Sequence, residues 1–90
     1  MYLTYDPDVD AIYVTLAKTP CHSTKELGLG RLVDYAADGR PVGIELLGVR
    51  RGVRVGGLPE QERLADLLRA NGIAVIDAPV APPPTGEGRS

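Results

Sequence analysis

The sequence predicts an α+β domain, an antiparallel β-sheet covered on one face by one C-terminal helix. Three observations predict it. Residues 2–16 read as a hairpin of two β-rich segments around a turn, and residues 30–49 read as a second hairpin. A leucine stripe with helical spacing then follows near residue 64. We expect two consecutive hairpins, giving four strands with room for a fifth.

The first hairpin is predicted from alternation. Residues 2–5 (YLTY) are short and β-rich, and residues 6–10 (DPDVD) have the composition of a turn. Residues 11–16 (AIYVTL) alternate, so that Ile12 and Val14 point to one face while Tyr13 points to the other. Residues 17–26 are polar and contain Pro20, which predicts a loop with a strand start near its end.

The second hairpin is predicted from Asp38-Gly39, a pair that favours a two-residue type I′ turn. This turn would pair Tyr35 with Val42, Val33 with Ile44, and Leu32 with Glu45. Pro41 cannot donate to the ladder, so it should be bulged or face outward. Gly28 and Gly30 suggest a bend in the third strand.

A basic, glycine-rich connector, residues 50–57, leads to the predicted helix. Pro59 suits the first helical position, and Asn71-Gly72 supplies a stop. The apolar stripe of Leu64, Leu67 and Leu68 should pack on the sheet. Residues 73–78 (IAVIDA) are a candidate fifth strand.

Length and composition bound the protein to one domain, residues 1–78, followed by a Pro/Gly-rich tail, residues 79–90, that we expect to be disordered. A core in so short a domain is marginal, which favours self-association or a small protein partner. A single cysteine excludes an intrachain disulfide. The sequence predicts neither a signal peptide nor a membrane span, so the expected location is the cytoplasm.

The formal net charge of −2 argues against a general nucleic-acid binder, although Arg50, Arg51 and Arg54 form one basic cluster. Gly28-x-Gly30 lacks a third glycine and a following helix, so it is not a dinucleotide fingerprint. We expect no cofactor.

Two segments resemble a family of short prokaryotic proteins known only as a domain of unknown function. Residues 5–16 carry its Tyr-Asp-x-x-x-Asp-Ala-h-Tyr pattern, where h is apolar, and residues 34–49 carry its central Asp-Tyr…Gly-x-h-h-Gly-Ile-Glu pattern. Ala36 stands where that family usually has Asp. Some members are encoded beside small toxin-like proteins, so the resemblance implies an antitoxin-like partner role.

Two groups of side chains invite simple site interpretations that do not hold up. Asp6, Asp8 and Asp10 alternate like the start of a calcium loop, but Ala11 and Ala17 replace the required Gly and Glu. Asp6 and Asp10 are therefore read as turn acids. Cys21 and His22, the only residues of their types, cannot complete a metal or nucleophile set within one chain. No metal site is predicted.

Tyr13, Asp34 and Glu45 are the main candidates, because the predicted strands place them on the sheet face opposite the helix. Two carboxylates and a phenol could bind an arginine of a partner, act as an acid–base pair, or hold a metal. We therefore predict a non-enzymatic interaction module, a homodimer or a partner subunit. The alternatives are a small acid–base or metal-dependent enzyme using this face and, third, weak nucleic-acid binding through the arginine cluster.

Overall fold

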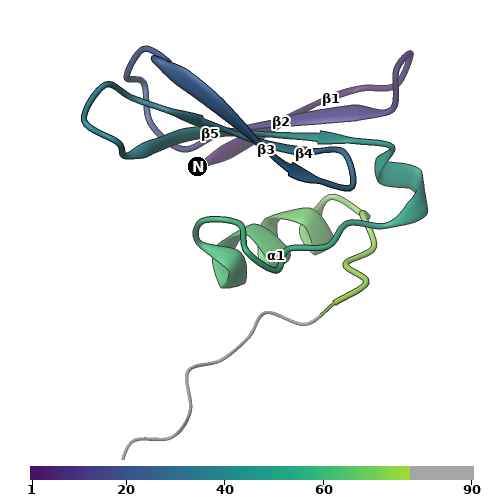
Figure 1. Ribbon diagram of the computed structural model, residues 1–90. Coiled ribbons are helices and arrows are strands. Elements are labelled where there is room, and N and C mark those ends of the chain that lie inside the picture. Colours follow the sequence, from purple (N-terminus) through teal and green to yellow (C-terminus); the bar gives the residue numbers. More distant parts are fainter. Residues whose placement is uncertain (78–90) are drawn as a thin grey trace, which may run out of the picture.

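The computed structural model describes residues 1–77, which form a two-layer α+β domain. In Figure 1 a sheet forms one layer, and a single helix lies beneath one of its faces. The strands are β1 (Tyr2–Asp6), β2 (Ala11–Thr15), β3 (Ser23–Gly28), β4 (Arg31–Tyr35) and β5 (Pro41–Leu47). A 3₁₀ turn, η1 (Val49–Arg51), and the helix α1 (Gln61–Ala70) follow. The predicted fold class is confirmed, whereas the predicted tail, residues 79–90, lies outside the described residues.

The sheet is antiparallel, with the strand order β1-β2-β5-β4-β3. The pairing of β2 with β5 joins the N-terminal hairpin to a three-stranded meander. The fifth strand is β3, which comes from the end of the segment predicted as a loop. Residues 73–78 were the other candidate, and within their described part only Val75 makes a single parallel bridge, to Val53.

The expected bend at Gly28 and Gly30 is instead a reversal of the chain between β3 and β4. Gly28, Leu29 and Gly30 all have positive φ angles, of 81°, 57° and 71°. Two of these positions tolerate that conformation because they are glycine. This reversal creates β3, the strand that forms one edge of the sheet.

The hairpin of β4 and β5 keeps most of the predicted register: Val33 lies opposite Ile44, and Leu32 lies opposite Glu45. The predicted two-residue turn is wrong. Ala36 accepts a hydrogen bond from the Gly39 N–H and donates to the Arg40 carbonyl, which makes a three-residue loop. A register shift after Asp34 compensates, and Tyr35 pairs with Pro41 rather than Val42. The proline is therefore at the irregular position where its missing donor is tolerated.

The core lies between the inner face of the sheet and the helix. Ile12, Val14, Val33, Ile44 and Leu46 supply the sheet side, and Leu64, Ala65 and Leu68 supply the helix side; all are at most 1 % exposed. The predicted connector, residues 50–57, begins within η1, so from here on the connector means residues 52–60, between η1 and α1. Its Val53, Val55 and Leu58 close one flank of the core. No described segment covers the opposite face of the sheet (Figure 1), which we call the outer face.

The helix α1 begins two residues later than the proline signal predicts. Glu60 precedes it with a left-handed φ of 52°, so Pro59 lies in the turn before the helix. The predicted stop is confirmed, since Asn71 caps the helix and Gly72 follows with φ 75°. Among residues 1–77, no helix has the length and apolar content needed to cross a membrane.

Candidate functional site

A chain of side-chain hydrogen bonds crosses the outer face. The Tyr13 hydroxyl on β2 donates to Asp34 Oδ2 on β4 at 2.7 Å, and the Thr24 hydroxyl on β3 donates to Asp34 Oδ1 at 2.6 Å. Because β5 lies between β2 and β4, the phenol must pass over β5 to reach Asp34. It passes over Gly43, where a Cβ would overlap the phenol hydroxyl and ring.

This environment raises the pKa of Tyr13 to about 12. Burial is the largest cause, followed by the hydrogen bond to Asp34 and by electrostatic interactions with Asp34, Cys21 and Glu45. Tyr13 is therefore a neutral donor near pH 7, and the raised pKa makes it a poor general base. Both carboxylate oxygens of Asp34 already accept hydrogen bonds, one from the Tyr13 hydroxyl and one from the Thr24 hydroxyl. This geometry favours a structural bond over acid–base chemistry at this pair.

The shift gives a prediction for alkaline pH. The folded-state pKa of Tyr13 lies above the ordinary tyrosine value of 10.0, so the folded state binds the phenol proton more tightly than the unfolded chain does. The corresponding stabilisation is complete below pH 10 and is lost as the pH rises through about 12. A tyrosinate absorbance titration should show a transition near pH 12 that is missing in Tyr13→Phe. If the variant keeps that transition, the assignment is wrong.

Glu45 lies beside this network. It faces Tyr13 across the β2–β5 pair and Leu32 across the β4–β5 pair. Its side chain is exposed and makes no hydrogen bond or ion pair with any other residue among 1–77. The structure thus brings Tyr13, Asp34 and Glu45 together, and of these three only Glu45 has a carboxylate available to a ligand. Their functional role stays a prediction.

The charge of the outer face is one-sided. Strand alternation and register place four acidic side chains on it, one each from β1, β3, β4 and β5: Asp6, Glu26, Asp34 and Glu45. No outward position in these five strands carries Lys or Arg. Beside Glu45, a hollow of about 460 Å³ is lined by Asp6, Tyr13 and the apolar side chains of Pro7, Val9 and Ala11.

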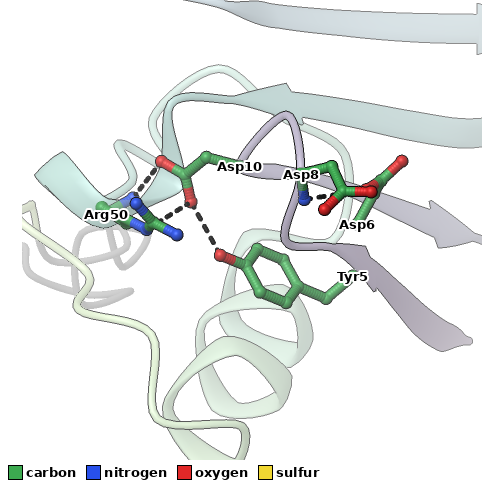
Figure 2. Close-up of polar contacts among 5 residues, drawn as sticks. All are labelled: Tyr5, Asp6, Asp8, Asp10 and Arg50. Carbon is green, nitrogen blue, oxygen red and sulfur yellow. Dashed lines mark hydrogen bonds and ion pairs between the residues drawn. The ribbon is translucent and has the colours of Figure 1, made fainter.

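The two turn acids have different roles (Figure 2). Asp6 Oδ1 accepts the Asp8 N–H at 3.0 Å, as an acid that closes its own turn does. Asp10 instead binds a segment forty residues away. Its carboxylate accepts the Arg50 N–H at 2.9 Å and the Tyr5 hydroxyl at 3.0 Å, and its carbonyl accepts the N–H groups of Gly48 and Val49. Asp10, with φ 53°, therefore ties the β1–β2 turn to η1.

The predicted basic cluster does not act as one unit. The Arg50 guanidinium lies 3.7 Å from the Asp10 carboxylate, which partly neutralises it. Arg51 and Arg54 are exposed and line a groove of about 540 Å³ between the β3–β4 turn and the connector.

Arg31, which the sequence reading passed over, holds the connector against the sheet. Its guanidinium donates to four backbone carbonyls: Arg54 at 3.1 Å, Gly56 at 2.5 Å, Gly28 at 3.2 Å and Leu27 at 3.4 Å. In the sequence, only the inward position of this charged residue in its strand indicates that Arg31 has a structural role.

Asp77 holds the same connector from the other side. Its carboxylate accepts the Val55 N–H at 2.7 Å and the Gly56 N–H at 3.0 Å. Burial alone would raise the pKa of Asp77, but these two donors and the Arg54 charge hold it below its usual value.

Cys21 and His22 lie at the end of the loop between β2 and β3. The Cys21 thiol is exposed and donates to the Ser23 carbonyl at 3.5 Å, while the His22 backbone N–H donates to the Tyr35 carbonyl at 2.7 Å. Within residues 1–77, no three His, Cys, Asp or Glu side chains converge as metal ligands would. The Cys21 Sγ nevertheless contacts the outer-face network, since it lies 3.7 Å from the hydroxyl oxygen of Thr24.

Comparison with protein families gives a match over the N-terminal half of the chain. Residues 3–50 match the model of a family described as a protein of unknown function (DUF2283). The matched segment contains the outer-face network and the Asp10 tie, and it ends before α1. No curated protein and no solved structure matches the chain.

Proposed function

Because the chain belongs to this family of unknown function, we propose a function from its own geometry: a protein-interaction module that binds a basic segment of a partner protein on its outer face. The observation that carries the proposal is the uncovered face with four acidic side chains and no Lys or Arg at its outward strand positions. An uncovered acidic face would suit a partner subunit, such as the antitoxin-like protein that the resemblance implies.

Charge complementarity supports a basic partner over a second copy stacked face to face. Two copies joined by this face would bring like charges together, which costs free energy unless they are screened. A basic segment would instead find Glu45, whose carboxylate has no partner among the described residues. The phenol of Tyr13 and the apolar wall of Val9 and Ala11 would contact the stem of an arginine side chain.

Apolar contacts supplement the charges. Leu47 on β5 is 46 % exposed and Tyr2 on β1 is 54 % exposed, both at outward positions. A single exposed ion pair contributes only about 0.2–1 kcal/mol, so burial of such side chains must provide much of the affinity. The charges would set orientation, association rate and salt dependence.

The proposal is tested with a nona-arginine peptide added to ¹⁵N-labelled protein at low salt. We expect amide shifts on β2, β5 and β4, and binding that weakens as salt increases. Glu45→Lys should weaken binding at least tenfold. Glu62→Lys, on the exposed face of α1, makes the same change in net charge away from the outer face and should change the dissociation constant less than twofold.

Two outcomes would refute the proposal. One is an equal loss of affinity in both variants, since that would show a response to net charge alone. The other is a set of shifts confined to α1 or the connector, which would place the peptide elsewhere.

A further inference from the structure

The two edges of the sheet are built differently. The edge strand β3 carries Lys25 at an inward position and has a register shift between Glu26 and Gly28. An inward charge and a bulge are common features that stop an edge strand from pairing with another chain. The other edge strand, β1, has neither. It pairs with β2 residue by residue over its five positions and contains no Lys, Arg, Pro or Gly.

The free edge of β1 offers backbone hydrogen-bonding groups. In an antiparallel pair, every second residue directs its N–H and C=O away from the neighbouring strand. Within residues 1–77, no segment other than β2 makes backbone hydrogen bonds with residues 2–6. Tyr2 and Tyr5, 54 % and 43 % exposed, add large side chains to this edge.

We propose that β1 pairs antiparallel with β1 of a second copy of this chain, about a two-fold axis at Thr4. An isologous contact of this kind closes on itself and leaves no further edge to extend. With Thr4 on the axis, all five residues pair: Thr4 faces its counterpart, Leu3 faces the partner's Tyr5, and Tyr2 faces the partner's Asp6. Inward side chains then meet inward ones, and outward meet outward.

The charges on β1 permit this register. Asp6 is the only charged side chain of the strand and lies at its end. In the proposed pair it lies opposite a tyrosine, and the two Asp6 side chains are four residues apart, or about 14 Å along the ribbon. That separation exceeds the Debye length of about 8 Å at physiological ionic strength, so their repulsion is largely screened.

A groove beneath β1 supplies apolar contact for the second copy. It has a volume of about 440 Å³, and its apolar lining comes from Leu3 and Tyr5 of β1 and from Val49, Ile73 and Ala74. Asp10, Arg50 and Asn71 also line it. Continuing the sheet places the partner's Leu3 and Tyr5 beside this groove. Apolar burial would then add to the backbone hydrogen bonds, which a five-residue edge alone makes in small number.

The first test measures the mass of the wild-type chain in solution by light scattering or sedimentation. A dimer is expected. Thr4→Lys, which sets two lysines opposite each other on the axis, should give a folded monomer. The matched control, Glu26→Lys, changes an outward side chain on the opposite edge and should remain dimeric. A monomer at millimolar concentration would overturn the proposal, and so would a dimer that only Glu26→Lys disrupts.

The second test fixes the register by oxidation in a Cys21→Ser background. Cys at position 4 would face its counterpart, with Cβ atoms about 5 Å apart, so Thr4→Cys should cross-link in high yield. Cys at position 2 would lie about 14 Å from its counterpart, so Tyr2→Cys should not. Cross-linking of Tyr2→Cys but not of Thr4→Cys would refute this register. Edge pairing leaves both outer faces open, so its failure is distinct from failure of the proposed function.

Discussion

Replacing Arg31 by leucine is expected to lower the free energy of unfolding by about 3 kcal/mol. The guanidinium donates to four backbone carbonyls at the junction of the sheet and the connector. Leucine would fill part of the space but leave the four carbonyls without this donor, and three of these hydrogen bonds are partly buried. Urea denaturation measures the loss, because the slope of the transition also reports whether the unfolded state has changed.

Two further variants define the cause. Lysine at position 31 keeps the charge but lacks the planar fork of donors, so Arg31→Lys should recover less than half of the loss. Arg54→Leu removes an exposed arginine from the same groove and should change stability by less than about 0.5 kcal/mol. If Arg31→Leu were as mild as Arg54→Leu, the connector would not depend on the guanidinium.

Gly43→Ala is expected to destabilise the protein by about 2 kcal/mol, although alanine is normally better than glycine in a strand. A methyl group at position 43 would overlap the Tyr13 phenol, which must then swing away and release Asp34. In a Tyr13→Val background the obstacle is gone, so the same Gly43→Ala change should be neutral or stabilising.

Thermal or chemical denaturation of the four proteins in this double-mutant cycle gives the coupling free energy directly. Tyr13→Phe separates the two causes, because it removes the hydrogen bond while keeping the ring over Gly43. If Gly43→Ala changed stability equally in the wild-type and Tyr13→Val proteins, the position of the Tyr13 phenol would not depend on the absence of a side chain at Gly43.

The sequence predicts the parts of this fold that rest on periodicity. The register of β4 and β5 is predicted from a two-residue Asp38-Gly39 turn that the structure does not have, yet Val33 still lies opposite Ile44. The alternating pattern holds this pairing, because a one-residue slip would expose every core side chain. The same register places Asp34 and Glu45 on the outer face. The position of Tyr13 beside them followed once β2 was taken to neighbour that hairpin.

Other features lack a local signal. The strand β3 has four exposed residues at its start and no alternating apolar pattern, so its sequence looks like a loop. The pair Asp38-Gly39 is compatible with more than one type of turn. In the observed three-residue loop only Gly39 has a positive φ angle, so Asp38 need not adopt the left-handed conformation. Arg31, Asp10 and Asp77 bind backbone groups more than twenty residues away, and residue type alone does not reveal such partners.

The β2–β5 pairing has a consequence for how the chain reaches its native state. The other three strand pairs join neighbours in the chain, whereas the pairing of Ala11 with Leu47 closes a loop that contains the whole intervening chain. Closing that loop carries the largest entropic cost of any pairing in the sheet. The bonds from Tyr13 to Asp34 and from Asp10 to the Arg50 N–H both span this seam. These two bonds stabilise the β2–β5 pairing against local unfolding. In a protein that lacks them, we expect the β1–β2 hairpin to separate first from the meander of β3, β4 and β5.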